Sequence, residues 1–143
     1  MAIEWRKNFA TNDPHIDEQH QQIFRFANKL EAIAEQAEVD TREVDHLLRF
    51  LETYIQNHFR YEEACMLKRR CPVAQKNRSE HLAFKGYLTR TLEVYHQNGY
   101  SQEWAQTLYS KLENWLSNHI CRVDVQLSDY PERVATSKAA NSN

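Results

Sequence analysis

Residues 41–70 read TREVDHLLRFLETYIQNHFRYEEACMLKRR and contain neither glycine nor proline. Apolar side chains recur along this stretch at intervals of three and four residues, which is the spacing of one face of an α-helix. The preceding Asp40, followed by Thr41 and Glu43, matches the capping pattern that begins a helix. The stretch therefore predicts a long amphipathic helix that fades around Arg70. Its buried stripe would consist of Val44, Leu47, Leu48, Leu51, Tyr54, Ile55, Phe59 and Met66.

Three further stretches have the same helical spacing. The first runs from Ile16 to Ala37, with Asp17 as its expected N-terminal cap. Another follows Cys71-Pro72 and stops at Asn98-Gly99, where Gly99 suits the C-terminal end of a helix. The last begins after the cap Ser101 and closes at 129–131. We therefore expect four helices of similar length joined by short loops.

The composition supports an all-α class. The 143 residues include only Gly 2 and Pro 3, too few for the many turns of a sheet protein. Short loops favour an antiparallel, up-down-up-down four-helix bundle. Residues 1–15, with Trp5, would form an N-terminal arm. We expect one bundle domain over residues 1–131 and a polar C-terminal tail over residues 132–143.

Charge and cysteine content exclude several classes of function. Lys+Arg 18 against Asp+Glu 20 gives a net charge of -2, so nucleic acid is not an expected partner. No apolar run reaches the roughly 18 residues of a membrane helix. The three cysteines lack a Cys-x-x-Cys pair, and no apolar signal region precedes them. These features favour a reducing, cytoplasmic location and no membrane partner.

Polar residues interrupt the apolar stripes at matching positions. Four of the seven histidines fall in phase with the core, one on each expected helix, and Glu62 follows one of them by a single turn. A buried carboxylate costs several kcal/mol unless it is paired or binds a cation. Imidazoles and carboxylates inside a bundle suit non-haem iron, manganese or zinc. The four histidines are His20, His58, His81 and His119.

Counting residues places these four histidines at one depth. Each lies about 18 to 20 residues from the loop that joins its helix to its neighbour, and at about 1.5 Å per residue the mismatch is a few ångström. His15, His46 and His96 fail this count. Asp124 is the candidate second carboxylate, but five residues after His119 is about 140° out of phase, so a local widening of the helix or a reaching rotamer would be needed.

These residues together resemble the hemerythrin family, in particular the single-domain bacterial hemerythrins. The matching segments are Trp5, Ile16-Asp17-Glu18-Gln19-His20, His58-Phe59-Arg60-Tyr61-Glu62-Glu63-Ala64-Cys65-Met66, His81-Leu82-Ala83-Phe84, and Trp115-Leu116-Ser117-Asn118-His119 with Asp124. The resemblance implies two non-haem iron ions with a bridging oxo or hydroxo group. His20 and His58 would hold one iron, His81 and His119 the other, and Glu62 and Asp124 would bridge the two.

The same resemblance implies the function. Family members bind O2 reversibly at a diferrous centre, which predicts oxygen binding, carriage or storage in preference to enzymatic activity. Oxidase- or peroxidase-like activity is the open alternative. Ile23, Phe59, Trp115 and Leu116 would wall the O2 pocket and keep out water. The alternative to a metal site is a purely structural bundle with buried histidines. Ferritin-like chemistry is disfavoured because only one Glu-x-x-His motif occurs, at Glu43 to His46.

Asn77 departs from the family pattern. Family members carry a fifth histidine one turn before the position of His81, where this chain has Asn77. Water or the amide oxygen of Asn77 would then take the place of that histidine. An amide oxygen is a weak, neutral ligand, so the second iron would be held less well. A second interpretation follows, in which the protein turns over or senses O2, peroxide or nitric oxide at an iron left open by Asn77.

Overall fold

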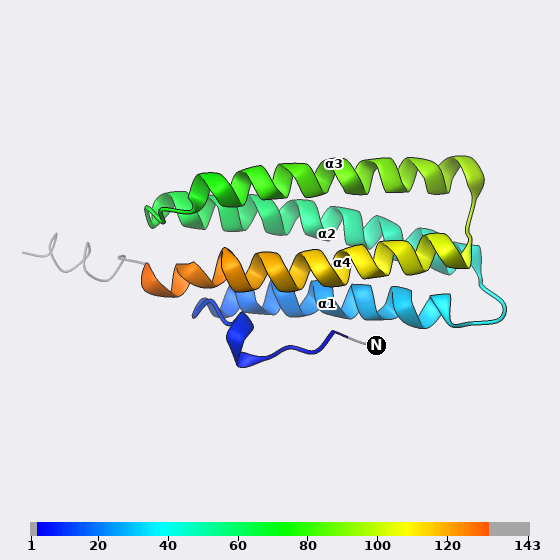
Figure 1. Ribbon diagram of the computed structural model, residues 1–143, viewed down its shortest axis with the longest axis horizontal. Coiled ribbons are helices and arrows are strands. Elements are labelled where there is room, and N and C mark those ends of the chain that lie inside the picture. The colour runs from blue at the N-terminus through cyan, green and yellow to red at the C-terminus, as the bar shows by residue number, and fades with distance from the viewer. Residues whose placement is uncertain (1–2, 132–143) are drawn as a thin grey trace, which may run out of the picture.

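A computed structural model describes residues 3–131 and confirms the all-α class (Figure 1). Within these residues the chain forms four α-helices and two short 3₁₀ helices and no strand. The α-helices are α1 (Pro14–Ala34), α2 (Thr41–Lys68), α3 (Ala74–Asn98) and α4 (Gln102–Arg122), and the 3₁₀ helices are η1 (Lys7–Phe9) and η2 (Asp124–Asp129).

The helices form the expected up-down-up-down bundle. In Figure 1, α1 and α3 run in one direction and α2 and α4 return in the other. Helix α1 packs against α2 and α4, and α3 completes the bundle against the same two helices. The α1–α2 and α3–α4 loops lie at one end, and the α2–α3 loop lies at the other. The shortness of these loops leaves each helix beside its sequence neighbour.

The N-terminal arm lies along the bundle and is fastened to α1. The backbone N–H of Ile3 donates to Asn28 Oδ1 at 2.8 Å, and Asn28 Nδ2 donates to the carbonyl oxygen of Ile3 at 2.9 Å. Trp5 packs against Phe9 and Phe24, with ring centroids 5.7 and 6.0 Å apart. The predicted tail, residues 132–143, lies outside the described residues, and the domain boundary at residue 131 stays a prediction.

Helix caps follow local chemistry, with one correction. Asp40 and Ser101 cap α2 and α4 as expected, and Gly99 ends α3 with a φ of 79°. The cap of α1 is not Asp17, however, but Asp13, whose side chain accepts from the N–H groups of His15 and Ile16. The fixed φ of the following proline suits the first position of a helix, so α1 begins earlier than predicted.

Helix α4 also ends earlier than predicted. It was expected to continue to residues 129–131, but it stops at Arg122. Val123 adopts φ -111° and ψ -61°, and the chain then tightens into η2. This change from α to 3₁₀ geometry turns Asp124 to a direction that a continuous helix would not give it.

The two ends of the bundle differ in what they bury. The end with the α1–α2 and α3–α4 loops has an apolar interior, which includes Leu30, Ile33, Leu48, Leu92 and Leu108. The other end buries ionisable side chains, described below. None of the helices within residues 3–131 is long and apolar enough to cross a membrane.

Candidate metal centre

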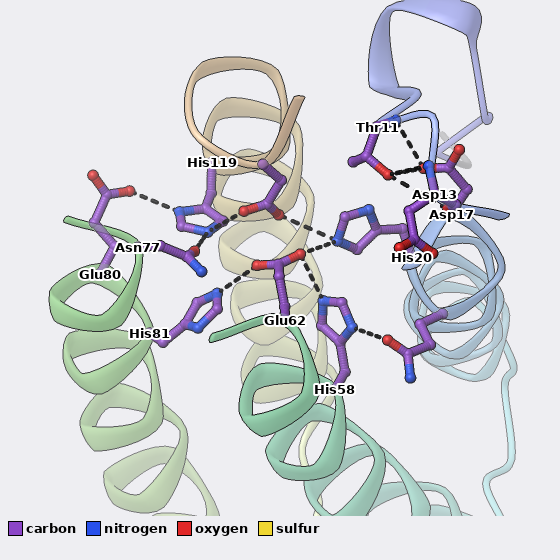
Figure 2. A network of polar contacts seen from close by, with 12 residues as sticks. Thr11, Asp13, Asp17, His20, His58, Glu62, Asn77, Glu80, His81 and His119 are labelled. Carbon is purple, nitrogen blue, oxygen red and sulfur yellow. Dashed lines mark hydrogen bonds and ion pairs between the residues drawn. The ribbon is translucent and has the colours of Figure 1, made fainter. Parts of the chain in front are cut away.

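Six ionisable side chains converge inside the bundle, near the end where α1 and α3 begin (Figure 2). Each is no more than 2% exposed. They come from all four α-helices and from η2, so no local segment could assemble them alone. They are His20 on α1, His58 and Glu62 on α2, His81 on α3, His119 on α4 and Asp124 on η2.

The six residues form two overlapping clusters. The first cluster contains His20, His58, Glu62 and Asp124, and the second contains Glu62, His81, His119 and Asp124. Within each cluster one potential ligand atom of every residue lies within 4.8 Å of the others. The two carboxylates belong to both clusters, and each of the four histidines belongs to only one.

The carboxylate oxygens divide between the clusters. Glu62 Oε2 lies 3.1 Å from His20 Nε2 and 3.4 Å from His58 Nε2, whereas Glu62 Oε1 lies 3.2 Å from His81 Nε2. Asp124 is split in the same way. Its Oδ2 is 3.2 Å from His20 Nε2, and its Oδ1 is 2.9 Å from His119 Nε2. Each carboxylate therefore offers one oxygen to either side, which is the arrangement of a bridging ligand.

Outer partners orient three of the imidazoles. His58 Nδ1 donates to Gln19 Oε1 at 2.6 Å, His81 Nδ1 to Glu63 Oε2 at 2.9 Å, and His119 Nδ1 to Glu80 Oε1 at 2.8 Å. A proton on Nδ1 leaves the Nε2 lone pair directed into the site. A hydrogen bond from Nδ1 to an acceptor is the usual support of a metal-binding histidine. His20 Nδ1 has no such partner among the described residues.

Several buried atoms in the site face one another without forming hydrogen bonds. Glu62 Oε1, His81 Nε2 and Asp124 Oδ1 have no hydrogen-bond partner among the described residues, although close neighbours surround them. Each such buried polar atom costs about 1–3 kcal/mol. A cation between the nitrogen and oxygen lone pairs would satisfy all three atoms at once. The donor set therefore fits a metal site.

The pKa values of Glu62, His20 and His81 show that the site favours added positive charge. Burial raises the pKa of Glu62, but the charge of His58 and the close nitrogens of His20 and His81 hold it well below its ordinary value. Burial lowers the pKa of His20, yet Asp124 and Glu62 raise it to about 10. Burial also lowers the pKa of His81, but Glu62 and Glu63 raise it to about 9. Glu62 therefore stays ionised and attracts protons or metal ions to the facing nitrogens.

Hydrophobic side chains surround the clusters. Ile23, Phe59 and Leu116 are buried, and Trp115 is partly buried. The Phe59 ring stacks on His81, with centroids 3.7 Å apart, and Trp115 stacks on His119 at 4.3 Å. These contacts hold the imidazole planes and cover the second cluster. The role of these four residues as walls of an O2 pocket remains a prediction.

Asn77 also faces the second cluster, one turn before His81 on α3. Its side chain is completely buried, and its Oδ1 lies 2.8 Å from His119 Nε2 (Figure 2). The remaining histidines, His15, His46 and His96, are exposed and lie outside both clusters, as the residue count predicted.

Sequence analysis missed the outer partners of the site. Gln19, Glu63 and Glu80 were given no role, although each directly precedes or follows a predicted ligand. All three support a histidine on another helix: Gln19 on α1 supports His58, Glu63 on α2 supports His81, and Glu80 on α3 supports His119. Such pairs depend on how the helices are rotated against each other, and the spacing along the chain does not carry that information.

A comparison with models of protein families finds one family whose model spans the fold and the site. Residues 11–128 match the family model described as Hemerythrin, with the description hemerythrin HHE cation binding domain. The chain belongs to the hemerythrin family. The matched range contains every residue of the two clusters.

Solved structures of hemerythrin are similar to this chain over nearly its whole length. The crystal structure of wild-type hemerythrin has 26% sequence identity and a TM-score of 0.78, covering 91% of this chain and 98% of that chain. A leucine-to-tyrosine mutant of hemerythrin has 27% identity and a TM-score of 0.77, with the same coverage of 91% and 98%. A leucine-to-alanine mutant has 27% identity and a TM-score of 0.77, covering 90% and 97%. Among curated proteins, none matches the chain.

Proposed function

We propose that this protein holds two non-haem iron ions and binds O2 at them. His20 and His58 would hold one iron, His81 and His119 the other, and Glu62 and Asp124 would contribute one oxygen to each. The observation that carries this proposal is the division of both carboxylates between the two clusters, with Glu62 Oε2 on one side and Oε1 on the other. A single metal ion would not need two carboxylates split in this way.

The donor set favours iron over softer metals. Imidazole and carboxylate ligands suit divalent iron, manganese and zinc, whereas thiolates, which favour zinc and copper, are absent from both clusters. Two ferrous ions, two carboxylates and one hydroxide would leave a charge of about +1 in the site. Ferrous iron supplies the electrons that reversible O2 binding requires.

The surroundings support binding of a small, uncharged molecule. Ile23, Phe59, Trp115 and Leu116 belong to the main hydrophobic core, beside the clusters. An apolar lining admits O2 and excludes water, which would otherwise promote loss of reduced oxygen species from the site. We assign these four side chains to the O2 pocket. Three free thiols at Cys65, Cys71 and Cys121 fit the reducing cytoplasm, where we place the protein.

Redox turnover or sensing of O2, peroxide or nitric oxide is the second candidate function, and one observation favours it. Asn77 offers a carboxamide oxygen, and not an imidazole, beside His119 Nε2. A neutral oxygen donor exchanges more readily than an imidazole, so small ligands would reach the second iron more easily.

Reaction of the reduced protein with O2 tests both candidates. We expect about two iron ions per chain after anaerobic reconstitution, and a visible absorption band that appears with O2 and disappears when O2 is removed. Immediate conversion to the oxidised protein with release of peroxide would instead establish turnover. An iron content near zero would overturn the proposal and leave a structural bundle.

A matched pair of histidine variants makes this test specific. His119→Ala removes a proposed ligand, whereas His96→Ala removes an exposed histidine from the neighbouring helix. We expect His119→Ala to lose about one iron per chain and the O2-dependent band, and His96→Ala to keep both. Equal iron content in the two variants would contradict the assignment of His119.

A further inference from the structure

Helix α3 does not need a polar side chain at the position of Asn77. Asn77 lies in the first turn of α3, and its backbone N–H already donates to the carbonyl oxygen of Val73 at 2.8 Å. The side chain is 0% exposed, so it gains no hydration. Figure 2 shows the carboxamide directed between His81 and His119, toward the interior of the site.

The two ends of the Asn77 carboxamide are in different situations. Oδ1 lies 2.8 Å from His119 Nε2, whereas Nδ2 has no hydrogen-bond partner among the described residues. A buried asparagine with a purely structural role normally uses both its donor and its acceptor. Here the oxygen alone is engaged, and it is engaged with the cluster.

The proton arrangement of His119 leaves the Oδ1 contact in need of a cation. His119 Nδ1 donates to Glu80, and its Nε2 lies close to two oxygens, Asn77 Oδ1 at 2.8 Å and Asp124 Oδ1 at 2.9 Å. With the proton on Nδ1, the Nε2 lone pair faces both oxygens and can donate a hydrogen bond to neither. A metal ion beside the three atoms can attract all of them.

The spacing of these atoms is that of neighbouring metal ligands. With metal–ligand bonds of about 2.1 Å, two adjacent corners of an octahedron are about 3.0 Å apart. The separations from His119 Nε2 to Asn77 Oδ1 and Asp124 Oδ1, 2.8 and 2.9 Å, are close to this value. The His81 Nε2 to Glu62 Oε1 separation of 3.2 Å is similar.

From this geometry we propose that Asn77 is itself a ligand of the second metal ion, bound through Oδ1. The proposal rests on the proposed metal centre and names a residue of it. The second metal then has two imidazoles, one carboxamide oxygen and an oxygen from each shared carboxylate. The first metal has two imidazoles and the carboxylate oxygens, so the two positions differ in donor number and in the presence of a neutral oxygen donor.

The test is titration of the metal-free protein with Co²⁺, followed by equilibrium dialysis and visible absorption. The d–d bands of Co²⁺ become more intense when its coordination number falls, so they report on ligands directly and without any O2 reaction. The wild type should bind two Co²⁺ per chain. Asn77→Ala should weaken the second ion at least tenfold and intensify its bands, while the first ion is unchanged.

Asn77→Asp provides the opposite change at the same position. It keeps the oxygen donor and adds a negative charge, so it should strengthen binding of the second Co²⁺ at least tenfold. Asn118→Ala and Asn118→Asp are matched controls, because Asn118 is exposed on α4 next to His119. Both controls should titrate like the wild type.

The outcomes separate this proposal from the metal centre as a whole. If the second Co²⁺ binds both Asn77 variants as it binds the wild type, Asn77 is not a ligand, although the metal centre stands. If Asn77→Ala does not fold, as judged by circular dichroism, the Asp variant decides: unchanged affinity overturns the proposal. A wild type that binds no Co²⁺ overturns the metal centre and this proposal together.

Discussion

The two ends of the bundle are built from the same four helices but are stabilised by different physical terms. At the loop end, side chains such as Leu30, Leu92 and Leu108 pack without polar groups, and hydrophobic burial is sufficient. At the site end, Glu62 and Asp124 lie buried among four histidines, and their charges need counter-charges. The comparison shows that hydrophobic burial stabilises one end, while the other end buries ionisable groups whose charges must be balanced.

Removing a shared carboxylate should have the largest effect. Glu62→Gln keeps the size of the side chain but removes the charge and replaces one of the oxygens that face the two clusters. We expect both metal ions to bind more than about 100-fold more weakly, since loss of even an outer partner costs 10–100-fold. Metal titration with dialysis measures this effect.

The control for this variant is Glu43→Gln, at an exposed position near the start of α2. It should leave both affinities unchanged. If Glu62→Gln retained one ion with full affinity, Glu62 would serve only one cluster, and the bridging arrangement would be wrong.

A cavity at the loop end should lower stability without changing metal binding. Leu108 is completely buried, so Leu108→Ala should lower the free energy of unfolding by about 2–5 kcal/mol. Urea unfolding with and without metal should give the same loss. Leu82→Ala, at a side chain that is 67% exposed, should change stability by less than about 0.5 kcal/mol. A fall in metal content in the Leu108 variant would show that the two ends are coupled.

Weakening an outer partner should affect one cluster only. Glu80→Gln replaces the charged acceptor of His119 Nδ1 by a neutral one. The second metal ion should bind about 10–100-fold more weakly, and the first should bind normally. Site-resolved Co²⁺ titration measures both, with the exposed Glu93→Gln as control. Equal weakening of both ions would mean that Glu80 acts on the bundle as a whole.

The smallest expected effect is at a helix cap of the loop end. The Ser101 side chain accepts from the N–H of Trp104 at 3.1 Å, so Ser101→Ala should cost about 1 kcal/mol of stability. Ser110→Ala, at an exposed position inside α4, should cost nothing because alanine is the better helix former. Thermal unfolding of the two variants gives the difference. A change in metal affinity in Ser101→Ala would contradict the separation of the two ends.

The fold was predictable from the sequence because its signals are local. Helical periodicity, the scarcity of glycine and proline, and caps such as Asp40 and Gly99 each act within a few residues. The predicted start of α1 was wrong. Asp13 and Asp17 lie close together before the apolar stripe, and only the backbone shows which carboxylate accepts the N–H groups. Asp17 instead accepts hydrogen bonds from Thr11 in the arm.

The sequence predicted the site residues whose placement depends on their position along the bundle axis. It did not predict contacts that depend on how a helix is rotated about its own axis. Counting residues along the helices placed His20, His58, His81 and His119 in one layer, and the structure brings them together. The sequence offered a wider helix or a reaching rotamer to explain Asp124, but the chain tightens after Val123 instead. That break depends on packing of η2 against the bundle end, which no local pattern encodes.

The contact between His20 on the first helix and Asp124 after the last one joins residues roughly 100 positions apart in the chain, at an Nε2 to Oδ2 distance of 3.2 Å. An ion held by both residues closes a loop that contains almost the whole bundle. Loop closure of this length removes conformational entropy from the unfolded chain, as a disulfide does. The centre would thus act as a reversible cross-link in a protein whose cysteines are all free.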